Sequence, residues 1–388
     1  MNNYGTPPVT FVRGVGAELW DDRGRRYLDF LCGLAVTGLG HAHPAVAEAV
    51  AAQAGTLIHT SNLFANEPTA EVVETLDRLI RSGPGGDAEP GRILFQNSGA
   101  EAVEAALKLA RKHQGRGRHG VVSAYGSFHG RTLATLAATG QPSKHEPFQP
   151  MPEGFRHVPF DDIDALVAAL DPSVGAVLLE SVQGEGGVVP AGDEYLQAVR
   201  QVCDERGILL VMDEIQTGLA RTGRWFGYQH AGVQPDIVTM AKALGNGVPT
   251  GAVWARSETA AAFAPGDHGS TFAGQPLALA AVRAVLAEMQ AMDAPAVARR
   301  LGAALREQLS RIDGVDGVRG RGLLLAAELS DGARVGRSAK DIASACLERG
   351  LVVNGVTPTA LRFAPPFVIS DAQLAEGCSI LAGALENG

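Results

Sequence analysis

Short apolar runs alternate with longer amphipathic stretches over most of the chain. Runs such as "VGAVLLE" (174–180) and "GILLVM" (207–212) have the length of a buried strand and are far too short to cross a membrane as a helix. The pattern predicts strands at 92–96, 120–124, 174–180, 207–212 and 236–240, and helices at 66–81, 99–113 and 193–206. This alternation is typical of an α/β fold with a mostly parallel central sheet.

The two ends of the chain differ from this middle part. Near the start, "GVGAELWDDRGRRYLDF" (14–30) holds two alternating stretches around the turn sequence "DDRG" and predicts a β-hairpin. From 292 onward we expect helices at 294–312 and 338–349, strands around 315–328 and at 351–353 and 360–364, and a last helix. We therefore expect an N-terminal segment, 1–42, that packs with a smaller α+β domain, 291–388, and a large domain, 43–290.

The composition narrows the class of partner. A formal net charge of −9 gives no reason to expect binding to nucleic acid or to an anionic membrane. The first residues lack the basic start and apolar core of a secretory signal. Four widely spaced cysteines form no C-x-x-C pair, and the "GHAHP" histidines lack a third ligand, so we expect no metal site. These features favour a cytoplasmic protein that acts on small molecules.

One helix begins with features that suit a phosphate group. In "FQNSGAEAVEAALKLAR" (95–111), Ser98 stands at the N-cap position and Glu101 follows at the spacing of a capping box. Gly99 would let a ligand approach the free backbone N–H groups of the first turn, with Ala100 beside it. The same residues also suit a helix that is simply well capped.

Two strand ends carry charged residues. Asp213 follows the strand "ILLVM" and Lys242 follows "DIVTM", and ligands of open α/β sheets bind at such carboxyl ends. Asp213 could hold a protonated ring nitrogen, bind a metal or cap a turn. Only five of the 33 basic residues are lysines, so Lys242 suggests chemistry that arginine cannot perform: losing a proton and attacking a carbonyl. A lysine whose chain lies along the surface is the alternative.

Other candidates lie in short loops. Phe128 in "AYGSFHGRT" could lie against a planar cofactor or fill a turn, and Arg131 offers a bidentate grip for an anion. The remaining candidates are polar residues near strand or helix ends: Glu185 in "QGEGG", Arg362 in "LRFAPP", and Ser270 and Thr271 in "HGSTFAGQP". Each also has a structural interpretation, as a surface turn, an ion-pair partner or a helix start.

Taken together, "NSGAEA", "SFHGRT", "QGEGG", "DEIQTG" and "AKALGNG" occur in an order and spacing that resemble the class III aminotransferases, which are pyridoxal-phosphate enzymes of fold type I. The resemblance covers nearly the whole chain, from "LWDDRGRRYLDF" to "LRFAPP". It implies pyridoxal 5'-phosphate as the cofactor, amino transfer between two small molecules, and a homodimer whose active site is shared between subunits.

The resemblance also implies roles for single residues. Lys242 would hold the cofactor covalently and move the proton, Asp213 would pair with the ring nitrogen, and Phe128 would stack on the ring. The phosphate would lie against Ser98, Gly99 and Ala100, with Thr271 contributed by the second subunit. The other residues expected at the cofactor are Glu214, Ile215 and Gln216, of which Gln216 would bond the ring hydroxyl.

Within the class, "HTSNLFANEP" and "FHGRT" are most similar to members of arginine biosynthesis that transfer the δ-amine of N2-acetyl-L-ornithine to 2-oxoglutarate. The products would be N-acetyl-L-glutamate 5-semialdehyde and L-glutamate. Arg131 and Ser270 would contact the acetylornithine end. Arg362 would bind the α-carboxylate of glutamate, and Glu185 would neutralise Arg362 when that carboxylate is absent.

Some residues depart from the family pattern and leave alternatives open. Ser181 stands in place of a common proline, Asn246 in place of a glycine, and Ala273 and Gln275 alter a segment near Thr271. The donor could therefore be ornithine, 4-aminobutyrate, succinylornithine or succinyl-diaminopimelate. An aminomutase of the same fold is a further alternative, whereas Lys242 and Asp213 together argue against a non-catalytic binding protein.

Overall fold

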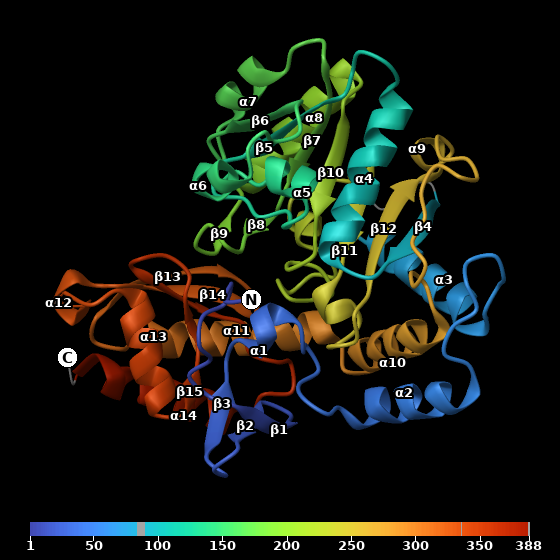
Figure 1. Ribbon diagram of the computed structural model, residues 1–388. Helices are drawn as coiled ribbons and strands as arrows, with labels where there is room; N and C mark the ends of the chain where they lie inside the picture. Colours follow the sequence, from blue (N-terminus) through green and yellow to red (C-terminus); the bar gives the residue numbers. More distant parts are fainter. Residues whose placement is uncertain (84–89, 335, 387–388) are drawn as a thin grey trace.

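The large part of the molecule is built on a central seven-stranded sheet (Figure 1). The computed structural model describes residues 1–83, 90–334 and 336–386. In spatial order the strands are β4 (Gly91–Gln96), β12 (Gly251–Arg256), β11 (Ile237–Met240), β10 (Leu209–Asp213), β7 (Val174–Leu179), β5 (Gly120–Ala124) and β6 (Phe155–Val158). Only β12 runs antiparallel to its neighbours, which confirms the predicted α/β fold with a mostly parallel sheet.

The central strands are apolar because helices cover the sheet. Every residue of β7, β10 and β11 is buried, as expected for parallel strands packed on both faces. In Figure 1, α4 crosses the sheet beside β10, β11 and β12. The helices of this part are α2 (Pro44–Thr56), α3 (Glu67–Arg81), α4 (Gly99–Gln114), α5 (Leu133–Ala138), α6 (Pro142–His145), α7 (Ile163–Ala169), α8 (Asp193–Arg206), α9 (Ser257–Ala260) and α10 (Pro276–Ala291).

Short elements fill the connections of this part. A two-stranded ribbon pairs β8 (Val182–Gln183) with β9 (Val189–Pro190). The 3-10 helices are η1 (Glu146–Phe148), η2 (Gly227–His230) and η3 (Lys242–Leu244). The ribbon and η3 both follow central strands, so they lie at the edge of the sheet where a ligand site is expected.

The C-terminal part is a smaller α+β unit, drawn in orange and red in Figure 1. Its sheet has the order β13 (Val315–Arg321), β14 (Leu324–Leu329), β17 (Ala360–Phe363) and β16 (Asn354–Gly355). Its helices are α11 (Ala294–Leu309), α12 (Asp331–Arg334), α13 (Ala339–Glu348) and α14 (Asp371–Glu386). The buried guanidinium of Arg221 joins this unit to the large part by donating to the carbonyl oxygens of Leu323 and Pro365.

The N-terminal strands lie against this smaller unit. The expected hairpin is formed by β2 (Glu18–Asp21) and β3 (Arg26–Asp29), with β1 (Phe11–Val15) at its edge and α1 (Cys32–Ala35) after it. β3 also pairs in parallel with β15 (Leu351–Val352). The division into 1–42, 43–290 and 291–388 remains a prediction, and α10 and α11 meet close to its second boundary.

Among the described residues, no helix is long and apolar enough to cross a membrane. The predicted helices and strands are present with boundaries that differ by at most three residues. The predictions did not include β12, which inserts between β4 and β11. A side-chain methyl at Gly251, the first residue of β12, would lie 2.4 Å from the carbonyl oxygen of Ser98, so glycine is needed for this close approach.

Candidate functional site

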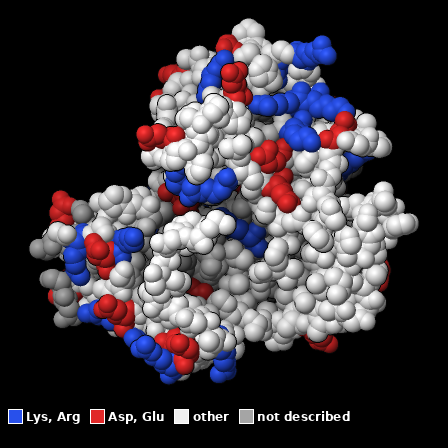
Figure 2. Space-filling view, viewed as in Figure 1, with Lys and Arg blue, Asp and Glu red and all other residues white. Residues whose placement is uncertain are grey.

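A cavity of about 390 Å³ lies where the carboxyl ends of the central strands meet the segments that follow them. Figure 2 shows the molecule hollowed at its centre, with Lys and Arg side chains at the edge of the hollow. A cavity of this size is in the range of small-ligand sites. The predicted residues that line it are Ser98, Gly99, Ala100, Phe128, Arg131, Glu185, Asp213, Ile215, Gln216 and Lys242.

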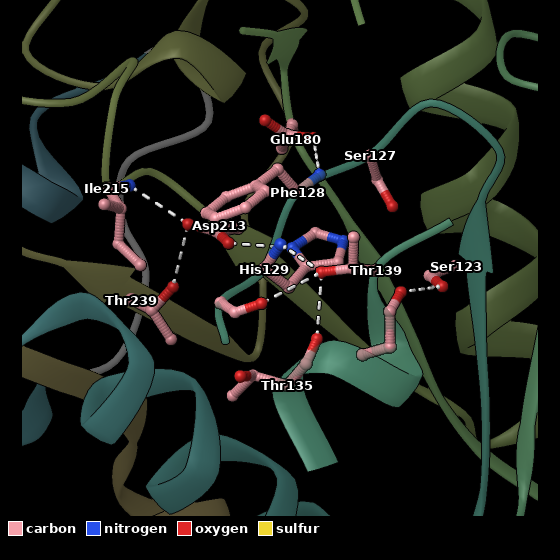
Figure 3. A network of polar contacts seen from close by, with 12 residues as sticks. Ser123, Ser127, Phe128, His129, Thr135, Thr139, Glu180, Asp213, Ile215 and Thr239 are labelled. Atoms are coloured by element: carbon pink, nitrogen blue, oxygen red, sulfur yellow. Dashed lines mark hydrogen bonds and ion pairs between the residues drawn. The ribbon is translucent and has the colours of Figure 1, made fainter. Parts of the chain in front are cut away.

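Asp213 is held in one orientation by three donors (Figure 3). Its Oδ2 atom lies 2.8 Å from Nδ1 of His129, and its Oδ1 atom accepts from the backbone N–H of Ile215 at 3.1 Å and the hydroxyl of Thr239 at 3.3 Å. The carboxylate is almost fully buried, so these contacts offset much of the cost of removing it from water. A buried, fixed carboxylate suits pairing with a cationic ring nitrogen.

His129 was not among the residues predicted from the sequence. It comes from the same segment as Phe128, only 1% of its surface is exposed, and its backbone N–H donates to the hydroxyl of Thr139 at 2.9 Å. Its Nε2 atom is buried and has no partner among the described residues. Nothing in "SFHGRT" signals this role, because the partner carboxylate of Asp213 lies 84 positions away.

Lys242 begins η3 one residue beyond the end of β11, in a backbone conformation that is unusual for lysine. Its φ is 46°, in the left-handed region that disfavours residues with a side chain. Such strain is found preferentially at functional sites. Burial and the positive charge of Arg362 together lower the pKa of the Lys242 amine to about 8, against the opposing attraction of nearby carboxylates. A large fraction of the amine is therefore neutral near pH 8.

The first turn of α4 forms one wall of the cavity. Ser98 is the N-cap, and its hydroxyl accepts from the backbone N–H of Glu101 at 3.2 Å. The Glu101 carboxylate bonds the backbone of Asn97 rather than that of Ser98, so only half of the expected capping box forms. A side-chain methyl at Gly99 would lie 2.8 Å from Cδ1 of Ile215, which shows how closely the backbone approaches that wall.

A second buried carboxylate, Glu180, fixes the loops on either side of the cavity. It accepts from the backbone N–H groups of Phe128 at 3.1 Å and Gly184 at 3.3 Å. Burial raises the pKa of Glu180 to about 7, with an opposing influence from His129 and a supporting one from Asp213. Glu180 thus connects the segment that carries Phe128 to the glycine-rich loop that carries Glu185.

Arg362 and Glu185 form an ion pair at the side of the cavity. The Nη1 atom of Arg362 lies 2.6 Å from Oε1 of Glu185 and 3.3 Å from Oε1 of Gln216, and its Nε donates to Oδ1 of Asn354 at 3.1 Å. Burial opposes ionisation of Glu185, but the attraction of Arg362 prevails, so the pKa of Glu185 lies below its ordinary value. The Nη2 atom of Arg362 is buried without a partner among the described residues.

Two cations lie near the ring of Phe128. The Cζ atom of Arg131 is 5.5 Å from the ring centroid, and the Nζ atom of Lys144 is 5.3 Å from it. Arg131 is exposed, and Lys144 is half-buried. Within residues 1–83, 90–334 and 336–386, neither cation makes a hydrogen bond or an ion pair through its side chain.

Four of the predicted residues do not line the cavity. The Glu214 carboxylate accepts from Thr217 and from the backbone N–H groups of Gly227 and Tyr228, and burial raises its pKa to about 7. The Ser270 hydroxyl lies 2.7 Å from Nδ2 of Asn97, outside the cavity wall. The other two are Thr271, which is exposed, and Arg362, which reaches the wall through Glu185 and Gln216.

The residues present fit pyridoxal phosphate. A helix N-terminus with a glycine can take the phosphate, a buried carboxylate can take the ring nitrogen, and an amine with a lowered pKa stands on the same cavity. The hydroxyl of Thr250, which also lines the cavity, is buried with no partner among the described residues and offers one more polar contact. The residues that the structure describes contain no group of three or more His, Cys, Asp or Glu that could hold a metal.

Comparison with known proteins leads to the same assignment of pyridoxal phosphate as the cofactor. The sequence profile described as "Aminotransferase class-III" matches residues 1–385. The chain is 45% identical to the acetylornithine aminotransferase of Corynebacterium efficiens over 99% of this chain and 94% of that protein. It is 47% identical to that of Mycobacterium tuberculosis over 96% of this chain and 91% of that protein.

Two crystal structures extend the comparison. The N-acetylornithine aminotransferase of Stenotrophomonas maltophilia is 37% identical, with a TM-score of 0.85 over 100% of this chain and 98% of that one. The ornithine aminotransferase of Toxoplasma gondii is 34% identical, with a TM-score of 0.92 over 100% of this chain and 92% of that one. The chain belongs to the class-III aminotransferase family. It is an aminotransferase, and its cofactor is pyridoxal 5'-phosphate.

Proposed function

We propose that this enzyme transfers the δ-amine of N2-acetyl-L-ornithine to 2-oxoglutarate, giving N-acetyl-L-glutamate 5-semialdehyde and L-glutamate. Similarity to acetylornithine aminotransferases over nearly the full chain supports the choice of donor. The observation that carries the proposal is a pair of arginines, Arg131 on the cavity wall and Arg362 behind the lining residue Glu185, because they offer two separate places for carboxylates.

Cofactor binding is assigned to residues already brought together at the cavity. Bound pyridoxal phosphate supplies a carbonyl carbon that takes up the amino group and a ring that takes up the electrons of a broken C–H bond. Asp213 pairs with the ring nitrogen, while His129, Ile215 and Thr239 hold its carboxylate in place. Phe128 lies against the ring, and the first turn of α4 binds the phosphate.

Lys242 holds the cofactor covalently and moves the proton at the reacting carbon of the substrate. A proton carrier works best when its pKa lies near the working pH, and burial gives Lys242 a pKa of about 8. Its strained backbone fixes the amine at the end of β11, beside the strand that carries Asp213. Lys242 is therefore the main catalytic residue of this proposal.

The two half-reactions place different demands on Arg362. L-Glutamate carries a carboxylate on its reacting carbon, whereas the reacting carbon of acetylornithine carries none. Arg362 is assigned to that α-carboxylate, and its unpartnered Nη2 atom supports a further acceptor. When acetylornithine is bound, Glu185 neutralises Arg362 through the 2.6 Å ion pair. Glu185 thus acts as a switch between the substrates.

Arg131 also favours the acetylated donor over free ornithine. Both donors have an α-carboxylate that Arg131 can bind, but ornithine also has an α-ammonium group beside it. An ammonium near an exposed guanidinium without an anionic partner is repelled, and acetylation removes that charge. Ornithine remains the second candidate because of the likeness to the Toxoplasma gondii enzyme.

The active enzyme is proposed to be a homodimer with Thr271 supplied to the partner's site. Leu63 and Phe64 are 85% and 68% exposed, and Phe272 is exposed beside Thr271. Asn62 fastens these segments together by donating to the carbonyl oxygen of Ala273 at 2.9 Å. Figure 2 shows few charged side chains on the lower-right face, where α2 and α10 lie in Figure 1, and such a face suits a second copy. A cytoplasmic location stays a prediction.

The donor is tested by steady-state kinetics with acetylornithine, ornithine, 4-aminobutyrate, succinylornithine and succinyl-diaminopimelate, each with 2-oxoglutarate. Acetylornithine should give the highest kcat/KM, with one glutamate formed for each semialdehyde. A higher value for ornithine would assign the second candidate, and turnover without consumption of 2-oxoglutarate would indicate an aminomutase. Sedimentation at assay concentration tests the dimer, which a fully active monomer would contradict.

A further inference from the structure

We propose that Lys144 and Arg131 together form a two-cation site for the carboxylate that lies far from the reacting carbon, and that Lys144 determines specificity for this group. The site takes the γ-carboxylate of L-glutamate and 2-oxoglutarate in one half-reaction and the α-carboxylate of the amine donor in the other. The second assignment rests on the proposed function, whereas the first holds for any donor.

The position of Lys144 is fixed by contacts with the segment that carries Phe128. Its backbone N–H donates to the carbonyl oxygen of Gln141 at 2.9 Å, and the Gln141 side chain donates to the carbonyl oxygen of Ser127 at 2.9 Å. On the other side, Nε2 of His145 lies 2.7 Å from the carbonyl oxygen of Thr139. Hydrogen bonds therefore hold the short helix α6 at both ends, and Lys144 projects from it toward the ring of Phe128.

The charges around this ring are unbalanced in a way that favours an anion. Lys144 and Arg131 approach the same ring to 5.3 and 5.5 Å, and each lacks a hydrogen-bonded or ion-paired partner in the part of the chain that the structure describes. Burial and the nearby charge of Arg131 lower the pKa of Lys144, and the weaker attraction of the Glu185 carboxylate, which is already paired with Arg362, does not reverse this shift. By contrast, the side chain of Lys108 donates to the carbonyl oxygen of Asp267 at 2.8 Å. A bound carboxylate would relieve the repulsion between the two unpaired cations.

Two different cations also suit substrates of two lengths. In acetylornithine the carboxylate lies one bond farther from the reacting carbon than the distal carboxylate of 2-oxoglutarate does. Arg131 offers a planar, rigid pair of donors, whereas Lys144 offers a compact charge on a flexible chain. Arg131 lines the cavity, and the Nζ atom of Lys144 lies 5.3 Å from the centroid of the ring that Arg131 also approaches. The flexible lysine can therefore follow the carboxylate as the substrate changes.

The first test compares L-glutamate with L-norvaline, which has the same carbon chain but no distal carboxylate. Lys144→Met should lower kcat/KM of the L-glutamate half-reaction about tenfold, the low end for a charged hydrogen bond at a partly screened site, and that of L-norvaline by less than about twofold. Lys144→Arg should retain most of the activity. Lys340→Met removes a lysine charge from the exposed face of α13 and should change kcat/KM for neither L-glutamate nor L-norvaline.

The outcomes separate the possible roles of Lys144. Equal losses with L-glutamate and L-norvaline would show that Lys144 only supports the Phe128 segment, and no loss with L-glutamate would show that it does not reach the carboxylate. Either result overturns the proposal. Because this arm does not use acetylornithine, it stays informative if the proposed donor is wrong.

A second arm tests the donor side with acetylornithine and N-acetylputrescine, which lacks the carboxylate. Lys144→Met should lower kcat/KM for acetylornithine but not for N-acetylputrescine. It should also narrow the preference for acetylornithine over ornithine. A wild-type enzyme inactive with acetylornithine would refute the proposed donor while leaving the L-glutamate result intact. A loss of equal size with N-acetylputrescine would contradict carboxylate binding by Lys144.

Discussion

Replacing Glu185 by glutamine should shift the enzyme toward L-glutamate. The Arg362 side chain is 1% exposed and that of Glu185 is 31% exposed, so water screens their 2.6 Å ion pair only weakly. The α-carboxylate of L-glutamate must displace Glu185 from Nη1 before it can bind both Nη1 and the unpartnered Nη2 atom of Arg362. Glutamine keeps a hydrogen-bond acceptor for Arg362 but removes the charge, which makes Glu185→Gln a selective perturbation of this competition.

The size of the shift follows from the loss of charge assistance. A hydrogen bond to a charged group contributes about 1.5–3 kcal/mol, and a neutral one contributes roughly half as much. If the glutamine binds Arg362 about 1.4 kcal/mol more weakly than Glu185 does, kcat/KM of the L-glutamate half-reaction should rise about tenfold relative to that of acetylornithine.

Rapid mixing of the holoenzyme with each substrate alone, followed by absorbance, measures both half-reactions. Glu18→Gln is the matched control, because Glu18 forms an ion pair with Arg26 at the same 2.6 Å separation but does not line the cavity. An unchanged ratio of the two half-reactions in Glu185→Gln would refute the switch.

Three further predictions concern the cofactor site. Lys242→Ala should abolish turnover and covalent attachment of the cofactor, with circular dichroism unchanged, and a variant that still transfers amines would exclude Lys242 as the anchor. Reconstitution of the apoenzyme should accelerate as pH rises to about 8 and then level off, because only the neutral Lys242 amine attacks and its pKa is about 8; acceleration continuing beyond pH 10 would show an unshifted lysine. His129→Leu should lower kcat roughly tenfold to a hundredfold by leaving Oδ2 of the buried Asp213 without its partner, while His129→Asn should lose less; equal values for both variants would argue against this positioning role.

The architecture could be predicted from local patterns because each element carries its own signal. The apolar strand "ILLVM" and the Ser98 helix start lie within two residues of their observed positions. β12 was missed because "GAVWAR" follows the loop-like "NGVPTG" and its pairing with β4 depends on residues more than 150 positions away. Strand order of this kind is not visible in a local pattern.

The candidate site was partly predictable for the same reason. Asp213 and Lys242 could be found because each lies at the carboxyl end of an apolar strand. Glu214 was grouped with Asp213, but consecutive residues at a strand end point to opposite sides, and the Glu214 carboxylate turns to the backbone of Gly227 and Tyr228 instead.

Contacts between distant segments left no local sign. The contact of His129 with Asp213 and the approach of Lys144 to the Phe128 ring have no spacing that could reveal them. The pairing of Glu185 with Arg362, 177 positions apart, was expected only from the family resemblance. Such contacts depend on how the strands and loops are ordered in space.

The most direct test of the proposed activity adds one substrate at a time to the purified holoenzyme and follows the visible absorption of its cofactor. Acetylornithine alone should remove this absorption faster, at equal concentration, than ornithine or 4-aminobutyrate, and 2-oxoglutarate added afterwards should restore it as glutamate forms. Absorption that persists with acetylornithine but is lost with another donor, or that 2-oxoglutarate fails to restore, would contradict the account.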